Sequence, residues 1–195
     1  MLAHPPDQNQ VPAVTPRRHD DIELLPLTEE HEGLVNGWLS NMDLAHLTTL
    51  DVPTYPAPGQ ARAFILDNQP GKGAYFFLLS QASTGKALGY GALGRIDAKN
   101  RSAILGMMIG DPPQRGHGFG TTAVHLMLQF AFDELNLHRI HCEFLAFNQQ
   151  SRRVCQKVGF REEGVKREAC YRAGAYRDVV QVAILAHEYK GRTGA

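Results

Sequence analysis

The residues best suited to chemistry lie between positions 107 and 128, where glycines alternate with other residues after an apolar run. Gly116, Gly118 and Gly120 follow Arg115 and precede a segment of helical period. Glycine lets the backbone adopt left-handed dihedrals and approach a ligand closely. A strand, a glycine loop and a helix in this order present free backbone N–H groups at the positive end of a helix dipole. The pattern predicts an anion site, for a phosphate or pyrophosphate, to which Arg115 adds charge.

Two common phosphate-binding patterns can be compared with this loop. The nucleoside-triphosphate loop needs Gly-Lys followed by Ser or Thr, which occurs nowhere in the sequence. The dinucleotide fingerprint Gly-x-Gly-x-x-Gly/Ala is matched by Gly118, Gly120 and Ala123, which keeps a nicotinamide enzyme as an alternative. That fold needs an acidic residue at the end of its second strand, and Glu143 has about the right separation but falls within a strand. The dinucleotide interpretation is therefore disfavoured.

Residues 115–120 also fit the pattern Gln/Arg-x-x-Gly-x-Gly/Ala, and a longer match follows the loop. It includes residues 132–140 and then Asn148, Ser151, Arg153, Lys157, Gly159 and Phe160. Residues 86–189 resemble the GNAT superfamily of acetyl-CoA-dependent N-acetyltransferases, and the resemblance is weaker over residues 22–85. The ending, residues 163–178, is similar to the branch that holds ribosomal-protein N-terminal acetyltransferases and spermidine acetyltransferases.

The resemblance implies that the glycine loop anchors the pyrophosphate of acetyl-CoA. It also implies that the preceding strand end contacts the pantetheine arm and that one N–H there polarises the thioester oxygen. Asn148 is expected to contact the same arm, to cap the next helix, or both. The residues expected to bind the cofactor are Met108, Ile109, Gly110, Arg115, Gly116, His117, Gly118, Phe119, Gly120, Thr121 and Asn148.

Cys155 is the position at which this sequence departs from the family pattern. The resemblance places it where many members carry the tyrosine that protonates the leaving thiolate. A cysteine can hold a proton at neutral pH, but it is shorter and a weaker hydrogen-bond donor than tyrosine. Three interpretations stay open: Cys155 is the acid, another group or water serves instead, or the site is weakly active or inactive.

No motif identifies the general base. Glu143 and His141 alternate along the expected strand after the helix, which places both on one face. Either could guide a proton away through water, and Glu143 is the candidate base; the simpler interpretation of each is a paired or solvent-facing polar residue. Glu168 and Asp178 could attract a cationic acceptor or pair with nearby arginines.

The resemblance implies an enzyme that transfers acetyl from acetyl-CoA to a primary amine by direct attack. The amine could belong to a protein N-terminus, a polyamine or another small molecule. The sequence does not identify it, because residues 31–70, which would face the acceptor, resemble the family least. Trp38, His46 and Tyr55 would lie near it, although Trp38 could equally belong to the core. The alternative is a catalytically weak CoA-binding regulatory or interaction module.

The composition is that of a globular protein of 195 residues, 43% hydrophobic and 21% charged. Lys+Arg and Asp+Glu number 20 each, so we expect no nucleic-acid or membrane partner. No apolar run approaches the roughly 18 residues that span a bilayer. The three cysteines lack Cys-x-x-Cys spacing and the nine histidines are scattered. We therefore expect reduced thiols, a cytoplasmic location and no metal site.

The elements that would position these residues follow from periodicity and turn signals. Strands are expected at 22–27, 74–80, 87–96, 102–109, 139–147, 162–169 and 179–186, and helices from Thr28, at 60–68, at 121–135 and at 148–158. The strand at 139–147 should run parallel to the one at 102–109, across the helix. The expected fold is α+β: a GNAT-like mixed, mostly antiparallel central sheet of about six or seven strands flanked by helices, with one central βαβ unit.

The same cues divide the chain into one domain with two tails. Residues 1–20 hold four of the eleven prolines and are expected to be a mobile tail. Residues 21–190 form the acetyltransferase domain that the resemblance implies, and residues 191–195 a carboxyl-terminal tail. We expect a monomer or a homodimer, because edge strands of the last hairpin could pair between subunits.

Overall fold

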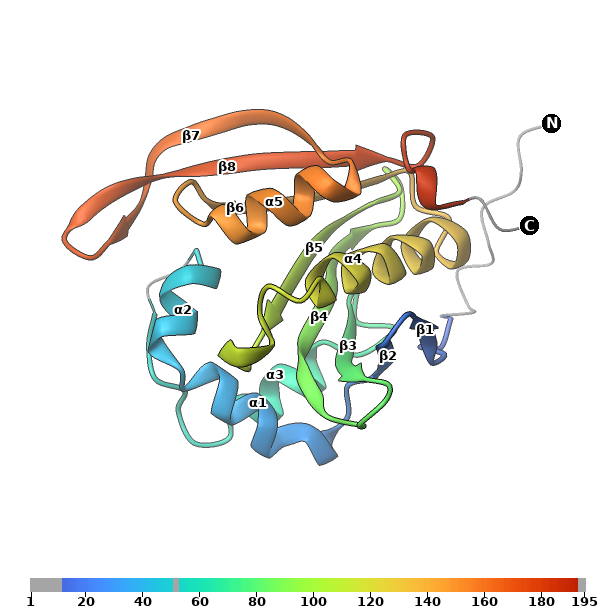
Figure 1. The fold of residues 1–195 in the computed structure, drawn as a ribbon, viewed down its shortest axis with the longest axis horizontal. Coiled ribbons are helices and arrows are strands. Elements are labelled where there is room, and N and C mark those ends of the chain that lie inside the picture. The colour runs from blue at the N-terminus through green and yellow to red at the C-terminus, as the bar shows by residue number, and fades with distance from the viewer. Residues whose placement is uncertain (1–11, 51–52, 193–195) are drawn as a thin grey trace.

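One eight-stranded sheet forms the centre of the fold, with the strand order β1-β2-β3-β4-β5-β6-β8-β7 (Figure 1). The computed structural model describes residues 12–50 and 53–192. The strands are β1 (Arg17–His19), β2 (Ile22–Pro26), β3 (Tyr75–Gln81), β4 (Ala87–Asp97), β5 (Ser102–Ile109), β6 (Arg139–Leu145), β7 (Arg161–Arg172) and β8 (Ala175–Leu185). The helices are α1 (Glu32–Leu39), α2 (Met42–Thr48), α3 (Gln60–Asp67), α4 (Phe119–Gln129) and α5 (Gln149–Val158).

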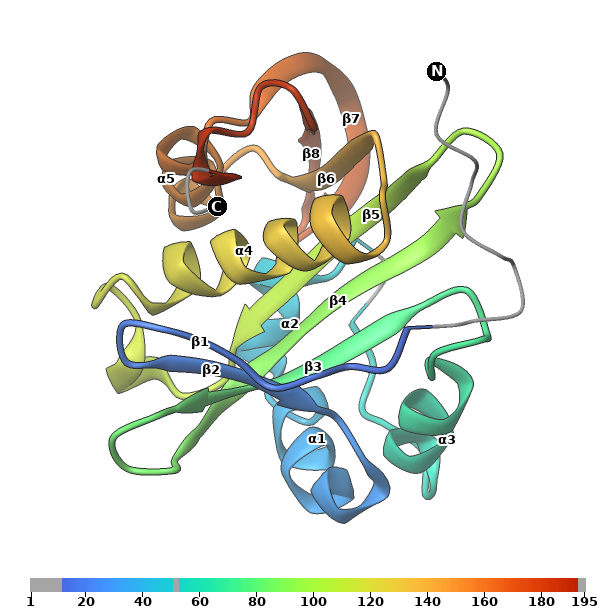
Figure 2. The same cartoon turned by 90° about the vertical axis from the view of Figure 1, so that its right-hand side faces the viewer.

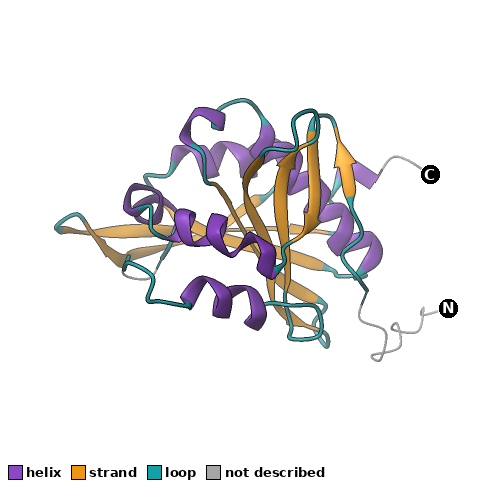
Figure 3. Cartoon of the chain, turned by 90° about the horizontal axis from the view of Figure 1, so that it is seen from below, coloured by secondary structure: helices purple, strands orange, loops and turns teal. Residues whose placement is uncertain are grey.

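Helices cover the sheet from both sides (Figures 2 and 3). On one face, α4 carries the expected three- and four-residue apolar spacing and buries Val124, Met127 and Leu128 against the strands. Phe130 follows in a π-helical turn (Phe130–Glu134) and packs edge-on against Phe77 of β3, with ring centroids 5.4 Å apart. Helices α1 and α3 bury their own apolar residues against the opposite face. Apolar layers thus cover both faces of the sheet.

The expected parallel pair of strands is present but short. β5 pairs with β6 only over residues 102–104 and 139–141, whereas the other neighbouring strands are antiparallel. Beyond Ile104, β5 stays paired with β4 up to Ile109. Beyond His141, β6 stays paired with β8 up to Leu145. The two strands therefore separate, and the sheet opens into a wedge at its middle (Figure 1).

The expectation of six or seven strands was one short, because the range predicted as a tail contains β1. Asp20 adopts a left-handed conformation (φ 51°) that turns the chain, and β1 pairs antiparallel with β2. Arg17 also bonds Glu134 at 2.6 Å and lies 5.4 Å from the Phe130 ring centroid. The proline-rich sequence of residues 1–20 gives no local pattern from which these long-range contacts could be predicted. The prediction of a mobile tail over residues 1–11 falls outside the described residues.

The other differences from the expected elements are local. Helix α2 was not expected, since residues 43–58 show little periodicity. The last hairpin is longer than expected, because β7 and β8 extend to a two-residue turn at Ala173 and Gly174. At the carboxyl end, residues 190–192 form a single 3₁₀ turn where a tail was expected from residue 191, and residues 193–195 fall outside the described part.

Candidate active site

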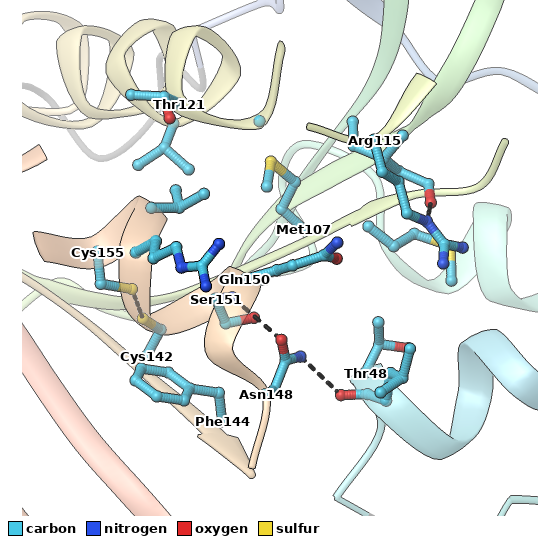
Figure 4. Close-up of a pocket in the computed structure, with 18 of the residues that line it drawn as sticks. Thr48, Met107, Arg115, Thr121, Cys142, Phe144, Asn148, Gln150, Ser151 and Cys155 are labelled. Atoms are coloured by element: carbon cyan, nitrogen blue, oxygen red, sulfur yellow. Dashed lines mark hydrogen bonds between the residues drawn. The ribbon is translucent and has the colours of Figure 1, made fainter. Parts of the chain in front are cut away.

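A cavity of about 340 Å³ fills the wedge between β5 and β6 (Figure 4). Its walls come from five elements: the ends of β5 and β6, the glycine loop with the start of α4, the first three turns of α5, and α2. Residues lining it include Leu105 to Ile109, Arg115, Gly116, Gly118, Gly120, Thr121, Asn148, Arg153, Cys155 and Lys157. Most of the expected cofactor residues therefore meet at one pocket. Gly110, His117 and Phe119 do not line it.

The glycine loop has the geometry that the sequence predicts. Gly116 and Gly118 both adopt φ +88°, a left-handed conformation that favours glycine. Gly118 is the N-cap of α4, and its carbonyl accepts the Thr121 N–H at 2.9 Å. An added Cβ on Gly120 would lie 3.1 Å from the Met107 side chain, so this glycine allows close packing of helix on strand. The N-terminus of an eleven-residue helix thus faces the pocket.

Two side chains of the loop are used within the loop itself. Arg115 Nε–H donates to the Ile109 carbonyl at 3.1 Å and ties the loop to the strand end. His117 Nε2 lies 3.2 Å from the Pro113 carbonyl, and its ring is 6.0 Å from that of Phe119. His117 and Phe119 therefore contribute backbone to the loop, while their side chains lie outside the pocket wall.

Ile109 is the strand-end residue whose backbone faces the wedge. The Gly110 N–H donates to the Leu88 carbonyl at 2.7 Å, so Gly110 is paired with β4. Hydrogen bonding alternates along an antiparallel strand, so Met108 also faces β4 and Ile109 faces away from it. The Ile109 carbonyl accordingly accepts a bond from Arg115 on the open side. Of the three N–H groups expected at the thioester, that of Ile109 is the one directed toward the pocket.

Asn148 joins two elements at the rim of the pocket. Its Oδ1 accepts the Ser151 N–H at 3.1 Å, which confirms the expected helix cap of α5. Its Nδ2 donates to the Leu47 carbonyl of α2 at 2.9 Å (Figure 4). Both ends of the amide are thus engaged by protein, and a contact between this side chain and the cofactor stays a prediction.

Cys155 lies in the pocket wall beside a second thiol that the sequence analysis did not connect to it. The Sγ atoms of Cys155 and Cys142 are 3.7 Å apart, and both side chains are buried. The hydrogen bond to Cys155, together with burial, raises the pKa of Cys142 well above its usual value. The hydrogen bond from Cys142 lowers the pKa of Cys155 in spite of burial. Cys155 thus shares a hydrogen bond with a second buried thiol at the pocket wall.

Glu143 lies at the pocket but is already paired. Its Oε1 accepts bonds from Lys166 Nζ at 2.6 Å and from Gln181 Nε2 at 2.9 Å. Desolvation raises the pKa of Glu143, but the two bonds together with the charges of Lys166 and His141 outweigh it. The net shift of the pKa is downward, which weakens Glu143 as a base. Desolvation lowers the pKa of His141, whose Nδ1 is buried without a hydrogen-bond partner among the described residues. His141 does not line the pocket.

The three residues suggested near the acceptor lie outside the wall of this pocket. Trp38 packs on Gly110, where an added Cβ would lie 2.2 Å from the indole, and its ring is 6.2 Å from that of Tyr90. Trp38 thus belongs to the apolar layer beside the end of β5. Tyr55 is 73% exposed and, like His46, lies outside the pocket wall.

The sequence analysis missed one wall of the pocket and two of its charges. Leu44, Leu47 and Thr48 of α2 form that wall. The residue that could have indicated the start of α2 is Asn41, whose side chain caps this helix by accepting the Leu44 N–H at 3.0 Å. Arg153 and Lys157, four residues apart on α5, also line the pocket, where Glu143 is the carboxylate residue. With Arg115 they make three cations against one carboxylate, a balance that favours an anionic ligand.

Fold and site together define a mixed α and β protein with a pocket, rich in positive charge, where its sheet splits. The chain belongs to the family described as Acetyltransferase (GNAT) domain, which matches residues 21–161. This confirms the family that the glycine loop and the later motifs predict. It overturns the dinucleotide alternative, since the sheet also lacks the repeated parallel βαβ units of that fold within the described residues.

Named relatives match over parts of their length. The chain is 34% identical over 107 residues to a putative ribosomal N-acetyltransferase, YdaF, of Bacillus subtilis, which covers 55% of this chain and 58% of the relative. It is 33% identical over 94 residues to a spermidine N(1)-acetyltransferase of Vibrio cholerae, and the match covers 48% of this chain and 54% of the relative. The chain thus spans between half and two thirds of these relatives.

A solved structure shows the same fold over nearly its whole length. It is spermidine N-acetyltransferase from Vibrio cholerae in complex with CoA and spermine, with a TM-score of 0.79 at 24% identity. The similarity covers 87% of this chain and 98% of that one. Across residues 12–50 and 53–192, no helix is both long and apolar enough to cross a bilayer, and no group of three or more His, Cys, Asp or Glu is placed to hold a metal.

Proposed function

We propose that this chain transfers the acetyl group of acetyl-CoA to a primary amine. The observation that carries the proposal is the pocket in the split sheet, where the glycine loop and the start of α4 meet the end of β5. The pyrophosphate would bind the N–H groups of the loop, assisted by Arg153 or Lys157. The pantetheine arm would then run along the wedge toward Ile109. Family membership supports acetyl-CoA as the co-substrate.

The chemistry requires three tasks at the thioester. The Ile109 N–H would donate to the developing oxyanion, a fixed backbone dipole that needs no reorganisation. The amine attacks the carbonyl carbon, the C–S bond breaks, and the CoA thiolate leaves. The Cys155–Cys142 pair lies at the pocket wall and could return a proton to that thiolate. The amine would lose its proton through water, with Glu143 a weak candidate base because it is paired with Lys166.

The acceptor enters from the side of α2. The β7–β8 hairpin is bonded to the chain just after α2, through Cys170 Sγ–H to Leu50 O at 3.2 Å and Arg172 to Thr49 O at 2.9 Å. These two bonds join the hairpin to the end of α2, and we expect this joined edge to select the acceptor. The names of relatives support two acceptor classes, a polyamine (spermidine) and a ribosomal substrate.

Amine-dependent release of CoA thiol tests the proposal. Purified protein is incubated with acetyl-CoA and one amine at a time. The amines are spermidine, spermine and short peptides with a free N-terminal amine. We expect release to rise with one amine class and the product amine to gain one acetyl group. Binding of acetyl-CoA without release by any amine would overturn the enzymatic proposal and favour a CoA-binding module, the alternative that the cysteine at position 155 keeps open.

A further inference from the structure

Two of the three cysteines form a close pair between a strand and a helix. Cys142 on β6 and Cys155 on α5 are each 8% exposed, with their sulfurs 3.7 Å apart (Figure 4). A disulfide bond is about 2.05 Å long. Rotation of either side chain about its Cα–Cβ bond moves its sulfur by more than the remaining gap. Such a rotation would bring the two sulfurs toward bonding distance.

The pair is also part of the pocket wall. Both cysteines line the same cavity as the glycine loop and the end of β5. Cys170, the third cysteine, does not line it and donates to the Leu50 carbonyl at the hairpin. The pocket thus brings two neighbouring thiols to a site whose proposed ligand carries a thiol of its own.

The hydrogen bond within the pair gives the two sulfurs different reactivity. The hydrogen bond between the two thiols raises the pKa of Cys142 and lowers the pKa of Cys155. The thiolate is the attacking species in disulfide exchange. Arg153, on the same helix, lines the same cavity and favours a negative charge there. Cys155 is therefore the thiol that reacts first, and Cys142 is the one that follows.

We propose that Cys142 and Cys155 are a redox-active pair that reduces coenzyme A disulfide bound in this pocket. The inference rests on the proposed function, because that function brings coenzyme A to the pocket. One half of the disulfide would occupy the acetyl-CoA site, and the other half would extend out of the open wedge. The pair gives the chain a second reaction with the same cofactor.

The exchange proceeds in two balanced steps. The Cys155 thiolate attacks one sulfur of coenzyme A disulfide, whose S–S bond breaks as a Cys155–CoA mixed disulfide forms. One CoA leaves as thiolate and takes up the proton that Cys155 had lost. Cys142 then loses its proton and attacks Cys155 Sγ, which releases the second CoA, and that CoA takes up this proton. In sum, one disulfide is reduced to two CoA thiols while two cysteine thiols are oxidised to one disulfide.

Intact mass and thiol counting of the reduced full-length chain test this proposal. After incubation with coenzyme A disulfide in the absence of oxygen, we expect two CoA released per chain. The thiols titrated after denaturation should fall from three to one. Cys142→Ser should stop at the mixed disulfide, with one CoA released and one CoA attached to Cys155. Cys155→Ser should release no CoA by this route.

Three controls separate the possible outcomes. Cys170→Ser should still form the disulfide, because Cys170 lies outside the pocket wall. Glutathione disulfide at the same concentration should react at least about tenfold more slowly, because it lacks the nucleotide that the loop would bind; equal rates would overturn the role of the pocket. Retention of all three thiols in a chain that acetyl-CoA stabilises against heat would overturn this inference alone. A chain that acetyl-CoA does not stabilise would overturn the proposed function first.

Discussion

A single peptide unit, between Met108 and Ile109, decides whether the pocket can polarise a thioester. An ideal Cβ on Gly89 would lie 2.0 Å from the Met108 carbonyl oxygen, so this carbonyl points toward β4. Because a peptide is planar and trans, the N–H of Ile109 must point the other way, into the wedge. The absence of a side chain at Gly89 therefore leaves room for this orientation of the peptide, which the register with β4 sets.

Gly89→Ala should lower the turnover number more than it lowers acetyl-CoA binding. The added methyl group must push the Met108–Ile109 peptide aside, and loss of one oxyanion donor typically lowers kcat by about 10²–10³-fold. We expect the free energy of unfolding to fall by about 1–3 kcal/mol from overpacking. Steady-state kinetics and urea unfolding provide both values.

Gly94→Ala is the matched control on the same strand, because an added Cβ there meets nothing within 4 Å. It should keep kcat within about twofold, a change of roughly 0.4 kcal/mol. Equal losses of kcat in the two variants would contradict the role assigned to Gly89.

Gly118→Ala tests the loop. At φ +88° an alanine is strained by about 1–2 kcal/mol, and the loop relieves that strain by leaving its ligand-binding conformation. We expect the Kd for acetyl-CoA, measured by titration calorimetry, to rise about tenfold, which corresponds to about 1.4 kcal/mol.

The control for Gly118 is Gly33→Ala in α1, an exposed helical position where a Cβ meets nothing within 4 Å. That change should stabilise the protein by about 0.5–1 kcal/mol and leave the Kd unchanged. A Gly118→Ala chain that binds as tightly as the Gly33→Ala chain would contradict the account of the loop.

Site residues that belong to a local motif could be predicted, and site residues brought in by distant contacts could not. Gly116 and Gly118 need positive φ, which the spacing of glycines before a helix announces. Cys142 gave no such signal as the partner of Cys155, because their contact depends on how α5 folds back on β6. Ile109 could be placed at the strand end from the sequence, but only the register with β4 shows which N–H is open.

At the scale of elements, Asn148 connects α5 to α2 across the mouth of the pocket. Asn148→Ala removes the cap and the bond to Leu47, and should lower the free energy of unfolding by about 1 kcal/mol. Asn148→Asp keeps an acceptor for the Ser151 N–H but cannot donate to Leu47. We expect both variants to raise the KM for the amine, and Asp to lose less stability. An unchanged KM in the Asp variant would show that α2 does not depend on this link.

The strands β6, β7 and β8 are tied together by Glu143, and this tie makes stability depend on pH. Its folded pKa lies below the unfolded value, so the stabilisation is present above the unfolded pKa and is lost as pH falls through the folded pKa. Glu143→Gln should therefore be less stable than the parent at pH 7, by at most about 1 kcal/mol because Lys166 is half exposed. The difference should shrink as pH falls below the ordinary glutamate pKa of about 4.3 and vanish once the pH is below the folded pKa. Urea unfolding across this range measures it, and a difference that grew in acid would have the wrong sign.

Elements with strong internal periodicity could be predicted, and elements held by distant contacts could not. The strands at 75–81 and 102–109 and helix α4 agree with the prediction within a few residues. α2 and β1 are short, and each is held by partners far away in the chain: Asn148 bonds α2, and Glu134 bonds β1. Their sequences alone carry too little apolar pattern to predict them.

For the whole molecule, the opening of the sheet follows from competition between strand partners. β5 has a long antiparallel ladder with β4, and β6 has one with β8, while the parallel pair between them spans three residues. The one parallel pair was predictable from the helix that crosses between the strands. The size of the wedge was not, because it depends on how far each outer ladder extends.

Thermal unfolding with acetyl-CoA tests the central claim, that this wedge is an acetyl-CoA site, most directly. A ligand at about 100 times its Kd adds roughly 2.7 kcal/mol of stability, which for a chain of this size raises Tm by several degrees. We predict such a rise with acetyl-CoA for the parent chain, a smaller rise for Gly118→Ala, and none with NADH. An unchanged Tm with acetyl-CoA at millimolar concentration, or a rise with NADH instead, would contradict the assignment of the pocket.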